Sequence, residues 1–420
     1  MGVFEVSLYQ PGIINPSTGK AVTYELYEVG SGDNDYILNA TLKLEANKAG
    51  TFEFDILPFH SYYSVLRRYI HYVCVKEDDD ILFYGRILNM NLAFNGTKHV
   101  TCEGLMANLL DCPMYDPNAS TVDKIFTISG SPGSMFSKAI KAYRNRIRTD
   151  IQAGNVPSGM FDYDLEEIDV SGGTSVGDFV LSELIEGVGG FVRIEYAEQN
   201  DKSITGILHW DDDPVLSSDL SSYATTTVNQ TITFGNNMLD LSGESSDDDI
   251  LTGIVPSWED GNNDKHWITT RTTDVDSNNS QIYVPYVVGA QSGLGAVGIT
   301  VVELPGTGSQ EKALAYATNY VNKYCSNYIL SSGINIDFDS FTVRALDMHY
   351  TESSSAQKIW LYDRVRIKCT PHSINRVLMC SSLEILIDNP INSGYTFSIY
   401  RPKASSNDKV LTRQIKRKGF

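Results

Sequence analysis

Alternating hydrophobic and polar positions dominate the first hundred residues of the chain. Residues 38–44 and 52–56 alternate on either side of a short turn, and residues 88–94 form a third run of the same kind. Alternation with a period of two predicts strands with one buried face. Asn95 and Gly96 follow the third run, and this pair predicts a hairpin with a type I′ turn. Short strands with tight turns indicate a small barrel or sandwich. The inward positions expected in the first run are Leu38, Ala40, Leu42 and Leu44.

The pattern changes to a helical period after Cys112. Ser134 can cap a helix that carries basic residues on its outer face and has its apolar positions at spacings of three and four. Thr174 is expected to open a second helix, which ends at the glycines of residues 187–190. A strand over residues 191–196 follows, so this region reads as α+β. The predicted inward residues are Phe136, Ile140, Tyr143 and Ile147 in the first helix and Val176, Phe179, Val180 and Leu184 in the second.

Strands return from Thr225 to about Trp258. Residues 260–308 are rich in Gly, Ser, Asn and Asp, which indicates long loops with short strands. A capping-box pattern at residues 307–310 predicts a further helix with an apolar stripe that reaches Tyr328. Alternation at residues 334–338 and 364–369 then predicts two more strands.

Net charge narrows the choice of partners. The 420 residues include 52 acidic and 33 basic side chains, for a net charge of −19. Such a chain is not expected to bind nucleic acid by neutralising phosphates. It could line a passage through which DNA slides, and simple solubility is an equal explanation. Residues 401–420 differ, because seven basic residues and one acidic residue give them +6.

The six cysteines are scattered and show no CxxC spacing, so we expect reduced, mostly buried thiols in a protein made in the cytosol. The first residues show no basic region followed by an apolar stretch, so no signal peptide is expected. No apolar run approaches the length of a membrane span. A length of 420 residues favours two to four domains.

Motifs for catalysis or cofactor binding are absent from the sequence. No HExxH, GxSxG or P-loop pattern occurs, and the glycines at 187–190 follow a helix where a dinucleotide site needs a strand. Nothing in the sequence points to a Cys–His nucleophile pair. We therefore expect no catalytic residue, no cofactor and no metal ligand.

Four acidic clusters are the best remaining candidates for a site. The clusters at residues 78–80, 211–213 and 247–249 are best explained as solvated turns. Residues 274–278 are similar to the start of a calcium loop. However, Asn279 stands where such a loop needs Gly, and Pro285 where it needs Glu. With 52 acidic residues, a pair of carboxylates at a glycosidase-like separation would be found by chance, so it has no diagnostic value.

Tyrosines gather at positions 62, 63, 69 and 72, beside the arginines at 67 and 68. A protein interface and ordinary core or rim packing explain them equally well. A sugar-binding platform is the weaker third explanation.

Several of these segments, read in order, resemble the phage tail hub and tail-associated lysin family. Residues 44–58 with His60 and the tyrosines at 62 and 63 resemble the family's opening strands. Residues 82–87 resemble its "Phe-x-Gly-Arg-Ile" strand, and residues 101–105 its "Cys-Glu-Gly" segment. The remaining matches are residues 109–111, 232–240, 248–256, 361–367 and 383–390. Together they span residues 4–400.

The resemblance implies an α+β, β-rich fold with two small β-barrel hub domains and α+β insertions, in a ring-forming trimer. The first barrel would occupy residues 1–112, and an α+β domain residues 113–225. The second barrel would combine residues 226–258 with 335–400. An inserted, loop-rich α+β domain would fill residues 259–334, and the basic C-terminal tail residues 401–420.

The same resemblance implies a structural role at the distal end of a tail in a virion assembled in the host cytoplasm. A homotrimer would adapt a six-fold tail tube to a three-fold tip and close the channel until genome ejection during host attachment. The implied partners are the distal tail or tail tube ring, the tape measure protein C-terminus, and tip or receptor-binding proteins. DNA would be met only in transit, and no membrane insertion is expected.

Two alternative functions stay open: a virion-borne wall hydrolase or endopeptidase, and a carbohydrate-binding receptor protein, for which residues 259–334 are the candidate module. Many members of this family continue into an enzymatic extension, and the end of this chain near residue 420 favours a protein that is not an enzyme. The basic tail is expected to dock on a neighbouring tail subunit. Its candidate docking residues are Arg401, Lys403, Lys409, Arg413, Lys416, Arg417 and Lys418.

Overall fold

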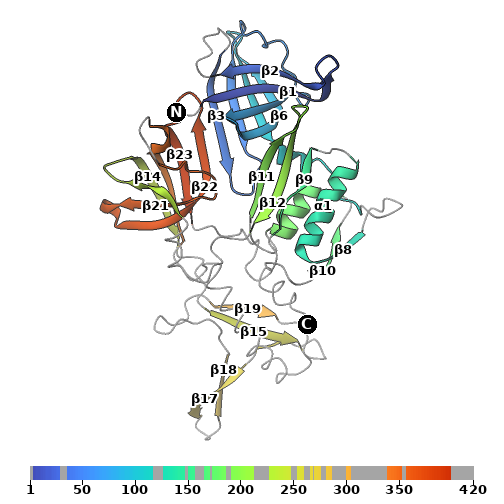
Figure 1. Cartoon of the computed structure of the whole chain (residues 1–420). Coiled ribbons are helices and arrows are strands. Elements are labelled where there is room, and N and C mark those ends of the chain that lie inside the picture. Colours follow the sequence, from blue (N-terminus) through green and yellow to red (C-terminus); the bar gives the residue numbers. More distant parts are fainter. Residues whose placement is uncertain are drawn as a thin grey trace.

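A computed structural model shows a long sheet in two differently oriented parts, with a helical region packed beside the first part (Figure 1). The structure describes residues 3–28, 36–116, 126–146, 150–156, 165–170, 173–185, 191–211, 227–246, 253–259, 265–267, 269–275, 281–285, 299–303, 338–351 and 356–398.

The main sheet has 13 strands, and eleven of them form one path. Its C-terminal part runs in the order β14 (Met238–Ser246), β20 (Phe338–Leu346), β23 (Asn392–Ser398) and β22 (Ile374–Leu386). Its N-terminal part continues as β3 (Ile37–Glu45), β4 (Thr51–Ile56), β7 (Lys98–Gly104), β6 (Asp80–Leu92), β5 (Tyr72–Glu77), β1 (Phe4–Asn15) and β2 (Lys20–Glu28). Strand β21 (Arg364–Cys369) pairs with β22, and β13 (Thr227–Thr233) pairs in parallel with β21.

Pairing between β3 and β22 joins the two ends of the chain into one sheet. Leu42 lies opposite Ile385, and Leu44 lies opposite Leu383, in antiparallel register. Among the described strands the path is open, with β2 and β14 at its ends. The β-rich α+β class expected from the sequence is confirmed. The two barrels and the domain boundaries remain predictions.

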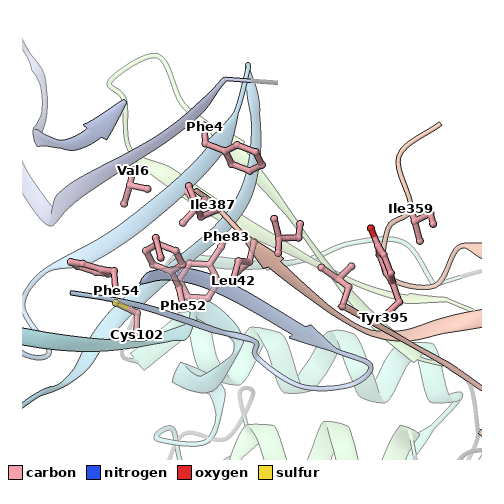
Figure 2. Packing of buried hydrophobic residues seen from close by; sticks show 14 of the residues in the cluster. Phe4, Val6, Leu42, Phe52, Phe54, Phe83, Cys102, Ile359, Ile387 and Tyr395 are labelled. Atoms are coloured by element: carbon pink, nitrogen blue, oxygen red, sulfur yellow. The ribbon is translucent and has the colours of Figure 1, made fainter. Parts of the chain in front are cut away.

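Strand β5 shows how the N-terminal part of the sheet is covered on both faces. Tyr72 and Cys74 belong to a core shared with the helical region, whereas Val73 and Val75 belong to a second core on the other face. All four are buried. The second core continues without a break into the C-terminal part of the sheet, where Tyr395 is one of its members (Figure 2).

The helical region contains the two predicted helices, with corrected starts. Helix α1 (Pro132–Arg146) begins before Ser134, because Pro132 occupies the first turn and the Ser131 hydroxyl accepts the Ser134 N–H at 3.4 Å. Helix α2 (Val176–Asp178) begins after Ser175, which forms a capping box with Asp178, and continues as the π-helix η2 (Phe179–Ile185). The predicted inward residues that the structure describes are buried: Phe136, Ile140, Tyr143, Val176, Phe179, Val180 and Leu184.

Short sheets complete this region. The predicted strand after the glycines is β11 (Phe191–Glu198), which pairs with β12 (Ile204–Asp211), and β12 pairs in parallel with β9 (Ile151–Ala153). A separate hairpin pairs β8 (Phe126–Gly130) with β10 (Leu165–Val170). The 3-10 helix η1 (Leu105–Leu109) leads from β7 into the region.

Two details of the predicted strands differ in the structure. Asn39 has a φ of 51° at a bulge in β3, which turns Leu38 outward and puts Ile37 in the core. The hairpin at Asn95 and Gly96 is confirmed, but only Gly96 has a positive φ, 87°. The Ala93 N–H bonds to the Thr97 carbonyl at 2.8 Å, so a three-residue loop replaces the type I′ turn.

A third group of strands lies apart from the main sheet (Figure 1). Strand β15 (Gly253–Glu259) pairs with β16 (Lys265–Trp267) and β19 (Ile299–Glu303), and β17 (Thr269–Val275) pairs with β18 (Gln281–Pro285). The 3-10 helices η6 (Met348–Tyr350) and η7 (Thr370–His372) flank the later strands of the main sheet. The strand predicted at 364–369 is confirmed as β21. The helix predicted after residue 307 and the glycines at 187–190 fall outside the described residues.

Candidate functional site: the junction of the two sheet parts

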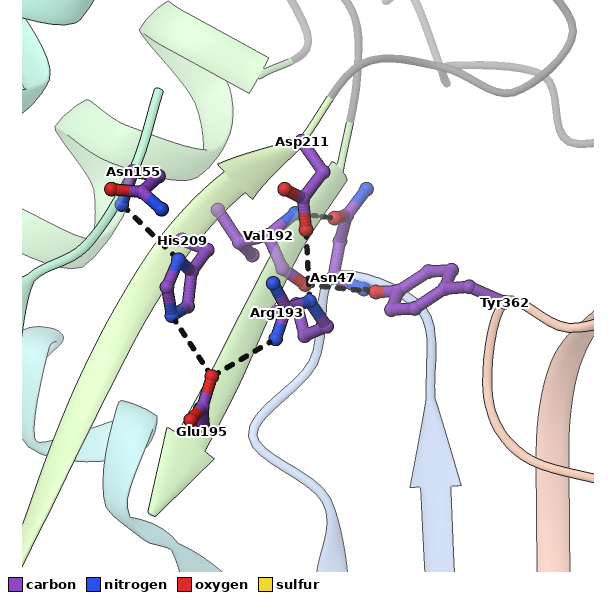
Figure 3. Close-up of polar contacts among 8 residues, drawn as sticks. All are labelled: Asn47, Asn155, Val192, Arg193, Glu195, His209, Asp211 and Tyr362. Atoms are coloured by element: carbon purple, nitrogen blue, oxygen red, sulfur yellow. Dashed lines mark hydrogen bonds and ion pairs between the residues drawn. The ribbon is translucent and has the colours of Figure 1, made fainter. Parts of the chain in front are cut away.

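Three distant segments meet at the turn between β3 and β4 (Figure 3). The Asn47 N–H donates to the Tyr362 hydroxyl at 3.0 Å, and that hydroxyl donates to the Val192 carbonyl at 2.9 Å. The Val192 N–H in turn donates to the Asn47 side-chain oxygen at 2.9 Å. These bonds form a closed ring that links the N-terminal part of the sheet, the helical region and the C-terminal part. Every group in the ring is neutral.

Backbone geometry at this junction is unusual on two of its three sides. Asn47 has a φ of 58° and Tyr362 a φ of 73°. Asn adopts this left-handed conformation readily, whereas for a bulky residue such as Tyr it is strained. The Tyr362 ring stacks on Phe191 with centroids 4.0 Å apart, and its N–H donates to the Cys380 carbonyl at 2.8 Å. Packing and hydrogen bonding therefore hold Tyr362 in a conformation that it would otherwise avoid.

Glycines bring the neighbouring strands unusually close to the junction. A Cβ on Gly104 would lie 1.8 Å from the Ala49 carbonyl oxygen, and one on Gly85 would lie 2.1 Å from the Glu103 carbonyl oxygen. Neither space admits a side chain. The Gly104 N–H also donates to the Gly50 carbonyl at 3.0 Å, which fixes the turn against β7.

An ion-pair cluster ties the strands beside these glycines together. The Arg86 guanidinium lies 2.5 Å from a Glu103 carboxylate oxygen and also bonds to Asp111 just after η1. Burial opposes the charge on Arg86, but the two carboxylates outweigh it, and the net effect raises the pKa of the guanidinium. This cluster gives a physical role to the Gly-Arg, Glu-Gly and Asp residues of the motifs that carried the family resemblance.

A second polar contact joins the two parts of the sheet elsewhere, and this one is charged where the first is neutral. Glu77 at the end of β5 is 6% exposed and pairs with the Lys358 ammonium. The Tyr350 hydroxyl lies 3.4 Å from the same carboxylate oxygen. Burial, and then the charge of Glu77, raises the pKa of Tyr350. The other Glu77 carboxylate oxygen is buried without a hydrogen-bond partner among the described residues.

Polar side chains on β11 and β12 extend the junction into the helical region. Arg193 bonds to Asp211 at 2.9 Å and lies 3.5 Å from Glu195. The His209 Nδ1 atom accepts the Asn155 N–H at 3.1 Å, and its Nε2 atom lies 3.4 Å from a Glu195 carboxylate oxygen. This arrangement holds a loop on the strand pair.

The acidic clusters weighed in the sequence are dispersed. Residues 78–80 lie at the β5–β6 turn, where Asp78 has a φ of 53° and accepts the Val3 N–H at 2.9 Å. Asp211 bonds to Arg193, while residues 212–213, 247–249 and 276–280 fall outside the described residues. No group of three or more metal-ligating side chains occurs among the residues that the structure describes. Across the same residues, no helix combines the length and apolar character of a membrane span.

The cysteines of the described residues lie in the core, whereas the clustered tyrosines range from buried to exposed. The five described cysteines are unpaired and buried, as predicted, and burial raises the pKa of Cys74, Cys102 and Cys380, which disfavours the nucleophilic thiolate.

Tyr72 is a core residue, whereas Tyr69 is 55% exposed with the Arg86 guanidinium over its ring. Tyr62 and Tyr63 are half-buried, at positions in between. Cys325 and the seven candidate docking residues of the basic tail fall outside the described residues.

Sequence reasoning missed the residues that form the junction itself. Asn47 and Tyr362 were seen only as members of two matching segments, and Val192 only as part of a strand. The available signal was that segments 44–58 and 361–367 both matched one family pattern. Nothing in either segment alone indicates that a tyrosine hydroxyl from one reaches a turn in the other.

Comparisons with known proteins agree with this architecture. No family model matches the chain, and no curated protein matches it by sequence. Among solved structures, the prophage tail protein gp18 from Listeria monocytogenes EGD-e is similar, with a TM-score of 0.50 and 11% identity over 98% of this chain and 99% of that one. The tail protein from Neisseria meningitidis MC58 has a TM-score of 0.51 and 12% identity over 98% of each chain. The chain therefore has the fold of phage tail proteins, which confirms the resemblance drawn from its sequence.

Proposed function

We propose that this chain is a structural, non-enzymatic subunit of a phage-type tail, and that three copies form a hub ring at the distal end. The similarity to two tail proteins along nearly the full length of all three chains carries the proposal. In the ring, the N-terminal and C-terminal parts of the sheet would each supply one β-barrel hub unit per subunit. Three subunits would then present six similar units to a six-fold tail tube and three equal faces to the tip.

The junction supports this role through its rigidity. A subunit that presents two equivalent units to one ring must hold them at a fixed angle. The Asn47–Tyr362–Val192 ring, the Glu77–Lys358 pair and the shared core all connect the two parts of the sheet. The strand pairing of β3 with β22 adds main-chain hydrogen bonds across the same boundary.

Sheet edges and charge fit the same proposal. Among the described strands, β2 and β14 lie at the two ends of the sheet path, where a neighbouring subunit could add a strand. A net charge of −19 suits a channel wall that DNA passes without binding. The partners would be the tail tube or distal tail ring, the tape measure protein C-terminus, and tip or receptor-binding proteins, within a virion.

The native mass of the purified protein at micromolar concentration tests the trimer. We expect a species of three times 46.5 kDa by mass photometry, and rings with a central channel by negative-stain electron microscopy. A protein that remains monomeric up to about 100 µM, where interfaces of ordinary size are saturated, would contradict a trimer that assembles without its partners.

Wall lysis and glycan binding, measured on the same preparation, test the two alternative functions. We expect neither activity at concentrations where the ring forms. Lysis of cell walls by the purified chain would instead support the hydrolase or endopeptidase, and saturable glycan binding would support the receptor protein.

A further inference from the structure

A pocket of about 180 Å³ opens beside the junction, between the β3–β4 turn, η1 and the start of η2. Its walls are almost wholly apolar, and its main lining residues are Ala49, Met106, Leu109, Leu110, Val180 and Leu181. The rim is open to solvent, since Leu110 is 49% exposed and the Lys48 side chain is 65% exposed. An apolar space of this size accommodates one or two aliphatic side chains of a docking segment.

The chain segments that line the pocket carry mostly negative charge. Five carboxylates lie within three residues of its lining positions along the chain, whereas Lys48 is the one cation there. Arg86 adds a second positive charge through its pairing with Glu103 and Asp111. A segment that inserts apolar side chains here would gain further binding energy from flanking basic residues. The five carboxylates are those of Glu45, Glu103, Asp111, Asp178 and Glu183.

The last described strand ends close to this pocket. Ser398, at the end of β23, lies opposite Met379 on β22. Ala46 packs against the cluster of Met379 and Phe191, and its N–H donates to the Ser381 carbonyl on β22 at 2.8 Å. Ala46 directly precedes the residues of the turn that line the pocket. An extended chain covers about 3.3 Å per residue, so the dozen residues after Ser398 can span about 40 Å. The distance from Ser398 to the pocket is therefore no obstacle to the following segment.

Residues 401–420 have the composition that the pocket and its rim require. They carry a net charge of +6, opposite to the rim, and their larger apolar residues, Val410, Leu411, Ile415 and Phe420, lie among the basic ones. Leu411 and Ile415 stand four positions apart, so a helical turn would place both on one face. We propose that the C-terminal segment 401–420 docks on its own subunit, with Leu411 and Ile415 in the apolar pocket and its basic residues on the acidic rim.

This location differs from the neighbouring subunit that charge alone suggested, and it does not depend on the hub function. Photo-crosslinking in the full-length protein tests it. With Ile415→p-benzoylphenylalanine, we expect irradiation to give cross-links to residues 45–49, 106–110 or 177–181, located by mass spectrometry. Raising the salt from about 50 mM to about 500 mM should lower the yield, because the charged rim is screened.

Two matched substitutions separate docking from chance contact. Leu110→Asp places a charge at the rim of the pocket and should lower the cross-link yield about tenfold. Leu92→Asp is the control, because Leu92 is an exposed leucine (71%) at the end of β6 far from Gly85 and the pocket, and it should leave the yield unchanged. Thermal unfolding of both variants verifies that they fold.

Three results would overturn the proposal. The first is cross-links that fall mainly elsewhere on the chain, and the second is equal yields in the two variants. The third comes from a mixture of ¹⁵N-labelled and unlabelled protein, where cross-linked pairs that combine both isotopes would show that the segment docks on another copy.

Discussion

The two polar contacts between the sheet parts differ in how their buried polar groups are paired. At Asn47, Val192 and Tyr362, neutral side-chain and main-chain groups hydrogen-bond to one another. At Glu77 and Lys358, a buried carboxylate pairs with a partly exposed ammonium, and one carboxylate oxygen has no partner among the described residues. A neutral contact that is lost leaves unpaired dipoles, whereas a broken ion pair leaves an uncompensated charge. Loss of one contact should therefore lower the free energy of unfolding by a different amount from loss of the other.

Gly104→Ala is expected to have the largest effect, because it breaks the neutral contact through the backbone. The new Cβ would meet the Ala49 carbonyl oxygen at 1.8 Å and push the β3–β4 turn away from Tyr362. We expect a loss of about 4 kcal/mol or more in the free energy of unfolding, measured by urea denaturation. Gly394→Ala is the control, since its Cβ would meet nothing nearer than 3.7 Å. Equal effects of the two substitutions would contradict the close approach at Gly104.

Lys358→Met should follow, with a loss of about 3–5 kcal/mol at pH 7, because the Glu77 carboxylate remains buried without its cation. Glu77 is 6% exposed, so water compensates little of this cost. The double variant Lys358→Met with Glu77→Gln should recover most of the stability, because no buried charge is left. A single variant that unfolds like the parent protein in urea would show that this ion pair is not desolvated.

Tyr362→Phe should have a smaller effect, a loss of about 1–3 kcal/mol, because the Asn47 N–H and the Val192 carbonyl lose their partner while the ring stack remains. Asn47→Gly is a useful companion, since it keeps the left-handed backbone but removes the side-chain oxygen that Val192 uses. Thermal unfolding of the two single variants and the double variant gives their coupling energy. Purely additive losses would argue against a closed ring.

Glu198→Gln should have the smallest effect on stability. Its effect should depend on pH, as expected for a charged contact and not for a neutral one. Burial pushes the pKa of Glu198 up, but hydrogen bonds from Lys202 and Lys76 outweigh it and leave the pKa lowered. A carboxyl with a lowered folded pKa stabilises the fold above its ordinary pKa, and this is lost as pH falls through the folded value. We expect the variant to lose about 1 kcal/mol at pH 7 and progressively less below about pH 4. A loss independent of pH would exclude the charged contact.

How much the sequence could predict depended on the range of the interaction. Short-range patterns placed several strands and both helices that the structure describes, but they gave no individual sign of β1, β2, β8, β9, β10 or β12. The described inward residues of α1 followed from periodicity alone. Errors arose where one residue changed the geometry. Asn39 adopts a positive φ and reverses the facing of Leu38, and Ser131 rather than Ser134 precedes the first helix. These choices depend on a single dihedral angle or cap, which a periodic pattern cannot resolve.

Contacts between segments far apart in the sequence could not be predicted for another reason. Pairing of β3 with β22 unites residues near the two ends of the chain, and no local pattern specifies which strand edge meets which. A tyrosine side chain has a polar hydroxyl and an apolar ring. Tyr362 was therefore equally compatible with a core, a rim or an interface position. The matching of several family segments in order was the only long-range information in the sequence.

The pairing of β3 with β22 also sets the order of events during protein synthesis. Strand β3 leaves the ribosome early, while the edge that covers it arrives only with residues 374–386. Until then β3 presents a free edge and the core that both sheet parts share is incomplete. A nascent or truncated chain is therefore exposed to wrong strand pairing for most of its translation. We expect chaperone dependence and inclusion-body formation to rise sharply for fragments that stop before β22, because closing so long a loop comes last.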